Sequence, residues 1–238
     1  MVATSFSYSG TELDALTEAG NYYRRILSCF EPHICGSVVE IGAGIGTFSA
    51  FLLNGTRLRK ITLIEPAGNL FPRLQHRFAG DPRVELRKGY LDDFAASLRA
   101  DAVVAVNVLE HAERDVEFLR SVHDILEPGG AALLFTAALP FLYGTLDESF
   151  EHYRRYTKRE LRAKMERAGL EVQQLRYFSL PGVVLWFLAG RVLRRRTIRP
   201  EEASFYDRRV VPWISRIERT WEPPLGQSLL AVGKRRGP

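Results

Sequence analysis

The chain has 238 residues, 46% of them hydrophobic, and carries 33 Lys and Arg against 28 Asp and Glu, a formal net charge of +5. This length allows one sizeable α/β domain. The longest apolar run near the end of the chain, residues 178–190, contains Pro181 and is shorter than the ~20 residues that span a bilayer, which argues against a transmembrane protein. Cys29 and Cys35 have no recognised ligand spacing and no signal peptide is evident, so we expect a reduced, cytoplasmic protein.

The first predicted elements are helices over residues 12–19 and 22–30. Residues 38–41 are largely apolar and rich in β-branched side chains, as in a strand buried on both faces. Glycines follow at positions 42, 44 and 46, and residues 47–53 begin a helix. A strand that turns into a helix over glycines lets a ligand approach the backbone, and the usual ligand is a nucleotide or nucleoside.

The spacing of these glycines narrows the choice of ligand. Thr47 stands where the dinucleotide fingerprint GxGxxG has its last glycine, and the Gly-Lys-Ser/Thr ending of a phosphate loop is absent. A glycine triplet can also be purely structural. Residues 61–65 predict a second buried strand that ends at Glu65, 19 positions past Gly46. A carboxylate there can accept hydrogen bonds from both hydroxyls of a ribose, and the alternative is a solvated charge at the strand end.

Helix and strand patterns alternate along the rest of the chain. Helices are predicted over 69–78, 94–98, 114–126 and 158–168, and strands over 84–88, 102–106, 131–136, 171–177 and 228–234. Thr157 and Glu160 form a capping box at the start of the last helix. Asn107 to His111 follow the strand over 102–106, at the edge where parallel sheets bind their ligands.

Five motifs follow one another in order: VVEIGAGIG (38–46), LIEP (63–66), GYLDDF (89–94), DAVVAVNVLEH (101–111) and LEPGGAALLF (126–135). Together they resemble the class I S-adenosylmethionine-dependent methyltransferases, over about residues 20–175. The five motifs in this order are far more specific than any one of them. The resemblance implies a single domain over 1–238 with a Rossmann-like, doubly wound seven-stranded α/β sheet. That sheet would be mostly parallel, with helices on both faces and residues 228–234 inserted as an antiparallel strand.

The resemblance also implies S-adenosylmethionine as the cofactor. Asp92 would take the exocyclic amine of adenine with Leu91 against the ring, although Asp93 could equally be a helix cap. Asn21, Tyr22 and Tyr23 lie in a helix that follows the cofactor in relatives, although an aromatic pair there also suits core packing. The implied cofactor-binding residues are Tyr22, Glu40, Gly42, Ala43, Gly44, Gly46, Thr47, Glu65, Pro66, Leu91, Asp92, Asn107, Val108 and Leu109.

His111, His152 and Tyr153 are the candidate catalytic residues. An imidazole suits a general base, which methyl transfer needs only when the acceptor is a hydroxyl or a carbon acid. Many relatives, however, carry the Glu110-His111 pair without using it for proton transfer. His152 and Tyr153 belong to residues 139–157, LPFLYGTLDESFEHYRRYT, which offer charged and aromatic side chains from Asp147 to Tyr156. This segment resembles the HYRRY(T/S) segment of a bacterial small-molecule branch and would lie over the site as a lid.

The C-terminal part of the chain is basic. Residues 151–238 hold 20 Lys and Arg against 9 Asp and Glu, whereas residues 1–150 hold 13 against 19. Residues 178–226 form a second insertion, in which an apolar run leads to the basic cluster at 191–196. Membrane-surface contact by residues 178–199 and anion binding are two interpretations. We favour a third, in which these helices close the substrate chamber and are basic on the outside.

These features predict an enzyme that holds a small-molecule acceptor in line with the methyl group of S-adenosylmethionine. The acceptor atom would be oxygen or nitrogen, with carbon also open, and the basic half suits an anionic or lipid-linked molecule. No metal site is recognisable, so no metal is expected. The alternatives are an RNA or protein methyltransferase, disfavoured because no RNA-binding module is recognisable, and a cofactor-binding protein without catalysis. The oligomeric state stays open.

Overall fold

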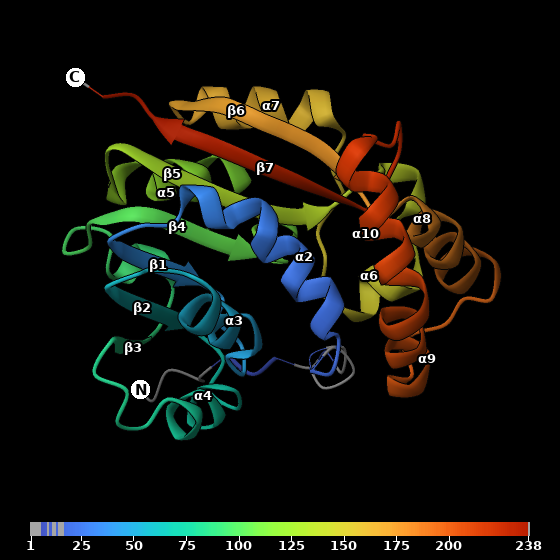
Figure 1. Ribbon diagram of the computed structural model, residues 1–238, viewed down its shortest axis with the longest axis horizontal. Coiled ribbons are helices and arrows are strands. Elements are labelled where there is room, and N and C mark those ends of the chain that lie inside the picture. The colour runs from blue at the N-terminus through green and yellow to red at the C-terminus, as the bar shows by residue number, and fades with distance from the viewer. Residues whose placement is uncertain (1–5, 9, 11–12, 14–16, 238) are drawn as a thin grey trace.

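The computed structural model describes residues 6–8, 10, 13 and 17–237. They form a seven-stranded sheet of order β3-β2-β1-β4-β5-β7-β6 (Figure 1). The strands are Ser37–Ile41 (β1), Lys60–Glu65 (β2), Val84–Lys88 (β3), Ala100–Val106 (β4), Leu126–Ala137 (β5), Leu170–Phe178 (β6) and Ser228–Arg235 (β7). The pairs among β1 to β5 are parallel, and β7 is antiparallel to both β5 and β6. The predicted fold class is therefore confirmed, with the inserted antiparallel strand.

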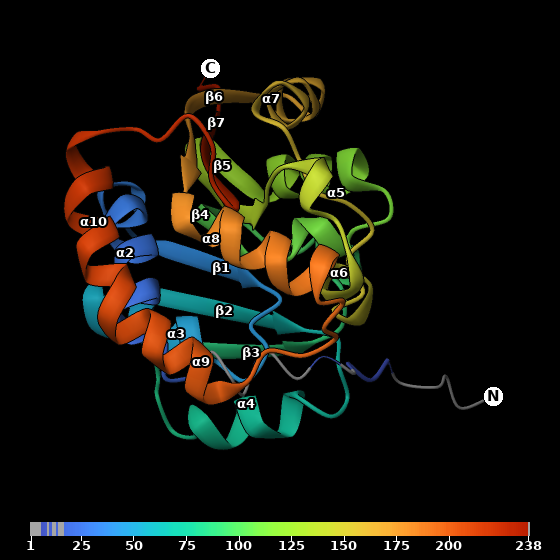
Figure 2. The same ribbon diagram turned by 90° about the vertical axis from the view of Figure 1, so that its right-hand side faces the viewer.

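Helices cover both faces of the sheet. Helices α2, α3 and α10 lie on one side of it, and α5 and α7 lie on the other (Figure 2). The helices are Gly20–Phe30 (α2), Thr47–Gly55 (α3), Phe71–Arg77 (α4), Asp115–Ile125 (α5), Thr145–Ser149 (α6), Lys158–Arg167 (α7), Leu180–Trp186 (α8), Pro200–Phe205 (α9) and Val211–Thr220 (α10). Strand residues such as Val103, Val104 and Leu133 are fully buried because both faces of the sheet are covered.

The helix predicted over residues 12–19 lies largely outside the described residues. The helix predicted over 94–98 is wrong, since these residues form turns after a short 3-10 helix, Leu91–Asp93 (η2). Asp93 caps that turn by accepting a hydrogen bond from the backbone N–H of Tyr90 at 2.8 Å. Cap and turn hydrogen bonds thus occupy the backbone where an α-helix would have started.

The segment between β6 and β7 crosses the carboxyl ends of the parallel strands. It contains α8, the π-helix Phe187–Val192 (η5), α9, the π-helix Tyr206–Val210 (η6) and α10. Buried Asp207 ties this segment to α2, because its carboxylate accepts hydrogen bonds from the backbone N–H groups of Asn21 (3.1 Å) and Tyr22 (2.8 Å). Arg25 and buried Glu218 form a second link between the same two parts. In the part of the chain that is described, no helix combines the length and the apolar character needed to cross a bilayer.

Candidate active site

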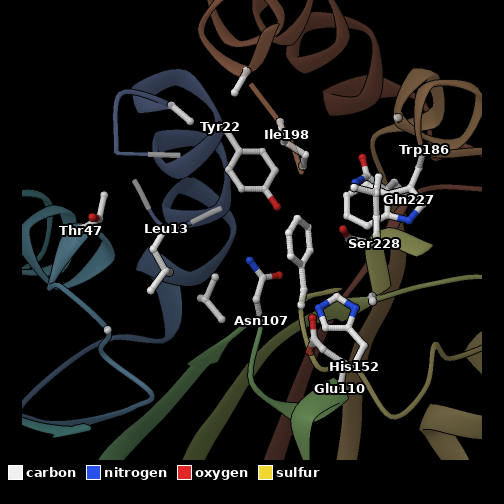
Figure 3. A pocket seen from close by; sticks show the side chains of 18 of the residues that line it. Leu13, Tyr22, Thr47, Asn107, Glu110, His152, Trp186, Ile198, Gln227 and Ser228 are labelled. Atoms are coloured by element: carbon white, nitrogen blue, oxygen red, sulfur yellow. The ribbon is translucent and has the colours of Figure 1, made fainter. Parts of the chain in front are cut away.

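A cavity of about 900 Å³ lies at the carboxyl ends of β1 and β4 (Figure 3). Its wall comes from the glycine turn after β1, from α2, and from the residues that follow β4. Two further segments complete it, residues 137–155 after β5 and residues 179–211 after β6. Segments far apart in the sequence therefore meet at one edge of the sheet, as expected of an α/β fold.

The glycine turn brings bare backbone to this cavity. Gly42, Gly44 and Gly46 have φ angles of 68°, 57° and 78°, which are in the left-handed region that favours glycine. A Cβ at Gly42 would lie 2.6 Å from Cγ2 of Val108, so the turn packs directly on the residues after β4. Of the described residues, a Cβ at Gly44 would meet Leu13 alone, at 3.6 Å. A ligand therefore has more space to approach the backbone at Gly44 than at Gly42.

Glu65 lies at the end of β2 and is buried, with its carboxylate turned to the glycine turn. It accepts hydrogen bonds from the backbone N–H of Gly44 at 2.7 Å and from that of Ala67 at 2.7 Å. Burial raises the pKa of Glu65, although these two hydrogen bonds oppose the shift. A carboxylate has about four lone-pair positions, so Glu65 can accept further hydrogen bonds on the side that lines the cavity.

Two buried oxygens in the wall of the cavity have no hydrogen-bond partner among the residues that the structure describes. They are Oε2 of Glu40, at the end of β1, and Oγ1 of Thr47, at the start of α3. Burial raises the pKa of Glu40 to about 8. An unpaired buried carboxylate oxygen is costly unless something binds it, so this part of the wall is suited to a cationic or hydrogen-bonding ligand.

Tyr22 of α2 extends over the middle of the cavity. Figure 3 shows its hydroxyl pointing into the space between Asn107 and Ser228. Burial raises the pKa of Tyr22 far above its usual range, so the phenol stays protonated and can donate a hydrogen bond. Asn107 has a φ of 55°, a strained conformation for a side-chain-bearing residue, at the first position after β4.

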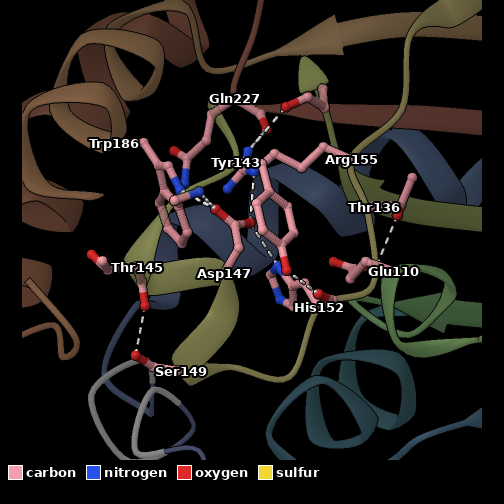
Figure 4. A network of polar contacts seen from close by, with 12 residues as sticks. Glu110, Thr136, Tyr143, Thr145, Asp147, Ser149, His152, Arg155, Trp186 and Gln227 are labelled. Atoms are coloured by element: carbon pink, nitrogen blue, oxygen red, sulfur yellow. Dashed lines mark hydrogen bonds and ion pairs between the residues drawn. The ribbon is translucent and has the colours of Figure 1, made fainter. Parts of the chain in front are cut away.

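The carboxylate of Asp147, in α6, is fully buried and is surrounded by donors (Figure 4). Nδ1 of His152 lies 2.9 Å from its Oδ1, and Nε of Arg155 donates to the same oxygen at 2.6 Å. Nε1 of Trp186 donates to Oδ2 at 3.1 Å. Burial alone would raise the pKa of Asp147, but the hydrogen bond from His152 and the charge of Arg155 hold it below its ordinary value. An ionised carboxylate only accepts, so Nδ1 of His152 donates this hydrogen bond, and in the neutral tautomer Nε2 is the accepting nitrogen.

His111 stands beside His152 in the same wall. The two rings meet edge to face, with centroids 4.9 Å apart. Burial lowers the pKa of His111, which favours the neutral imidazole. The preceding Glu110 is also buried, and its Oε2 accepts a hydrogen bond from Thr136 at 2.8 Å. The site therefore holds two imidazoles side by side.

Most of the residues implied from the sequence line this one cavity, but five of them do not. Those that line it are Tyr22, Glu40, Gly42, Ala43, Gly44, Thr47, Glu65, Pro66, Asn107, Val108, His111 and His152. The five outside its wall are Gly46, Leu91, Asp92, Leu109 and Tyr153. The roles of both groups stay predictions.

The surroundings of the five outside residues are mainly structural. A Cβ at Gly46 would lie 2.4 Å from Phe78, so this glycine is needed for packing. Leu91 and Leu109 belong to the main hydrophobic core. Asp92 accepts a hydrogen bond from Ser121 at 2.6 Å, and the side chain of Tyr153 is exposed.

Sequence reasoning missed several residues of the wall. Trp186 and Ser228 come from α8 and β7, and no local pattern ties them to the glycine turn. Phe6 and Tyr8 line the cavity from the N-terminal segment, which Asn69 holds by hydrogen bonds to the backbone N–H and C=O of Tyr8 at 3.0 and 2.9 Å. Asp147 is outside the wall and was already among the side chains that residues 139–157 offer, but its hydrogen bond to His152 was not predicted.

Comparison with known proteins supports one family. Residues 17–175 match the family described as methyltransferase domain. None of the curated proteins matches the sequence.

Solved structures of low sequence identity share the fold. Phosphoethanolamine N-methyltransferase 2 of Haemonchus contortus, solved with S-adenosyl-L-methionine, is 17% identical with a TM-score of 0.62, over 98% of this chain and 54% of that one. An S-adenosylmethionine-dependent methyltransferase of Mesorhizobium loti is 16% identical with a TM-score of 0.57, over 88% and 95% of the two chains. The [4+2]-cyclase SpnF is 14% identical with a TM-score of 0.60, over 98% of each chain. At such identities the likeness concerns the fold alone.

Proposed function

Since the chain belongs to the methyltransferase domain family, we propose that it transfers a methyl group from its cofactor, S-adenosylmethionine, to an oxygen or nitrogen atom of a small molecule. The observation that carries this proposal is the single cavity that joins the glycine turn to His111 and His152. Its volume of about 900 Å³ is at the upper end of the roughly 300–1,000 Å³ of small-molecule sites. It therefore has room for a second small molecule beside the cofactor.

The wall near the glycine turn fits this cofactor. When bound, S-adenosylmethionine supplies a methyl group on a positively charged sulfur, together with an ammonium and a carboxylate. The unpartnered Oε2 of Glu40 suits the ammonium, and the unpartnered Oγ1 of Thr47 can donate to the carboxylate. Glu65 would accept hydrogen bonds from the ribose hydroxyls while its bonds to Gly44 and Ala67 fix its position.

His152 is the side chain best suited to remove a proton from the acceptor. Its Nδ1–H bond to Asp147 fixes the tautomer, so Nε2 can accept a proton from a hydroxyl or an ammonium in the cavity. Asp147 is then a positioning residue, because it acts on the acceptor only through the imidazole. Tyr22 and Asn107 would orient the acceptor from the opposite wall.

His111 would assist rather than remove the proton itself. Burial lowers the pKa of His111, so His111 is a weaker base than an ordinary imidazole. Its edge-to-face contact with His152 keeps the second ring in place. Tyr153 has an exposed side chain outside the wall of the cavity, so we assign it no part in the proton transfer.

Two measurements test the proposal. Calorimetric titration with S-adenosylhomocysteine tests the cofactor site, and lack of binding at millimolar ligand would refute it. Incubation of cell extracts with S-adenosylmethionine labelled in the methyl group then tests the acceptor class. We expect enzyme-dependent label in the small-molecule fraction, and strong loss of that label with His152→Gln at unchanged cofactor affinity. Label in RNA or protein would favour the alternative acceptors, and binding with no label in any fraction would favour a protein without catalysis.

A further inference from the structure

The cavity opens to solvent through apolar side chains. Leu185, Leu188, Leu193 and Phe205 each line the cavity and are also 51%, 44%, 60% and 65% exposed. They come from α8, the π-helix η5, the residue after it, and α9. These elements lie side by side across the carboxyl ends of the strands, on the face that Figure 2 views directly. The entrance to the site is therefore surrounded by leucine and phenylalanine, which water solvates poorly.

The apolar surface extends outward from this entrance. Val184, Phe187 and Val192 lie on the same helical run and are 59%, 40% and 57% exposed. We call these seven residues the entrance surface. Single exposed apolar residues are normal, whereas a group of large ones around the opening of a cavity indicates a contact site.

The segment that carries the entrance surface is rich in arginine. Residues 180–217 contain eight arginines, no lysine and three acidic residues. Of the acidic residues, Asp207 is buried against the start of α2, Glu202 pairs with Arg195 at 2.8 Å, and Glu201 is exposed. Arg194, Arg196 and Arg199 are exposed. The surface around the entrance is thus strongly positive as well as apolar.

We propose that the entrance surface docks on an anionic lipid bilayer. Apolar side chains that enter the headgroup boundary, flanked by basic side chains that bind lipid phosphates, are the usual means by which helices lie on such a surface. Arginine suits this role because its planar guanidinium binds phosphate through two donors. A protein bound to the same residues would cover the opening of the cavity, whereas a bilayer offers both the negative charge and an apolar phase continuous with the opening.

The proposal also defines the acceptor, and this part rests on the proposed function. A molecule that reaches His152 from a bilayer must pass Leu185, Leu188 and Leu193, so its body is apolar and its reactive end carries the hydroxyl or amine. We therefore infer an amphipathic acceptor with a long hydrocarbon chain. Its chain would stay among the apolar side chains of the entrance while the polar end reaches the imidazoles.

Sedimentation with vesicles tests the docking. We expect the full chain to bind vesicles of equal parts phosphatidylcholine and phosphatidylglycerol, more weakly at high salt, and not to bind phosphatidylcholine alone. The variant Arg194→Gln/Arg196→Gln/Arg199→Gln should lose about a hundredfold in affinity, because each basic residue near an anionic surface contributes about fivefold. Val184→Ser/Val192→Ser should lose about tenfold through the lost apolar burial.

The matched control removes three positive charges at the opposite edge of the sheet. Arg57→Gln/Arg59→Gln/Lys60→Gln changes exposed residues at the start of β2 and should bind vesicles like the unchanged chain. Equal loss in this control, or no binding to the anionic vesicles, would overturn the proposal. A stable dimer in light scattering that Val184→Ser/Val192→Ser dissociates would also overturn it, in favour of contact between copies. Titration with S-adenosylhomocysteine on the same samples reports the cofactor site separately, so loss of docking and loss of the proposed function are distinguishable.

Discussion

Asp147 fixes the orientation of His152 through a hydrogen bond of 2.9 Å between Oδ1 and Nδ1. The same carboxylate accepts hydrogen bonds from Arg155, from Trp186 and from the backbone N–H of Gly144. One buried charge thus joins the segment after β5 to α8, which comes after β6. This arrangement links the stability of the C-terminal cover to the geometry of the imidazole.

Loss of this charge should destabilise the fold. Asp147→Ala leaves the guanidinium of Arg155, itself only 3% exposed, buried without its carboxylate. Breaking a buried pair by removing one partner typically costs about 3–5 kcal/mol, and we expect a loss of this size in the free energy of unfolding. Denaturant unfolding followed by circular dichroism measures it. The adjacent Glu148→Ala is the control, because Glu148 is exposed and should change stability by less than about 0.5 kcal/mol.

Glu40 should make the free energy of unfolding fall as the pH rises. Its pKa is about 8 in the folded chain against an ordinary value of 4.5, so between these values the folded state binds a proton that the unfolded state has released. The contribution of Glu40 to the free energy of unfolding is fully present below pH 4.5. It falls by about 1.4 kcal/mol per pH unit as the pH rises toward 8. Glu40→Gln stays neutral throughout. Its stability relative to the unchanged chain should therefore rise across this range, and a constant difference would contradict the prediction.

Binding of the cofactor should release a proton from the same group. With a pKa of about 8, Glu40 is largely protonated at pH 7, and a cationic ligand beside it favours the carboxylate. Calorimetric titration with S-adenosylhomocysteine, whose ammonium is the relevant cation, should give a binding enthalpy that depends on the ionisation enthalpy of the buffer. In Glu40→Gln this dependence should disappear and the affinity should fall. An enthalpy independent of the buffer in the unchanged chain would rule out the contact.

Gly42 should tolerate substitution much less well than Gly80. Both have positive φ, 68° and 83°, so alanine costs about 1–2 kcal/mol of backbone strain at either position. At Gly42 the new Cβ would also lie 2.6 Å from Val108, whereas nothing lies within 4 Å at Gly80. We expect Gly42→Ala to lower the free energy of unfolding by about 2 kcal/mol more than Gly80→Ala does, as measured by thermal unfolding. The double variant Gly42→Ala/Val108→Ala should regain part of the lost free energy of unfolding. If it regains none, contact with Val108 is not the cause of the loss.

Glu65→Ala should weaken the binding of S-adenosylhomocysteine by about ten- to hundredfold. Hydrogen bonds to a charged group contribute about 1.5–3 kcal/mol, and the substitution also removes the acceptor for the Gly44 and Ala67 backbone N–H groups. Glu85→Gln is the control, since Glu85 lies on the neighbouring strand and pairs with Lys60 away from the cavity. Unchanged affinity in Glu65→Ala would contradict the assignment of the ribose to this side chain.

The sequence alone was sufficient for the fold and for the glycine turn. Apolar runs, glycines and turn residues are local features, and they predicted strands that match β1 to β7 along the chain. The seven-stranded class with its inserted antiparallel strand came from the resemblance to the methyltransferase family, and the structure confirms it. Glu65 was predicted from its place at the end of a strand, and the family motifs added Glu40 and Asn107. All three line the cavity, because strand ends meet at one edge of a parallel sheet. The helix predicted over 94–98 failed for a local reason as well, since a capped turn satisfied the backbone first.

Only the tertiary structure decided how the site is closed. Trp186 and Ser228 approach the glycine turn through long-range packing that no local pattern encodes. The tertiary structure also decided which residue pairs with His152. Asp147 contacts His152, Arg155 and Trp186 together only because α8 folds back over the segment after β5. A hydrophobic pattern indicates that one face of a helix or strand will be buried. Which other element packs against that face depends on the fold of the whole chain.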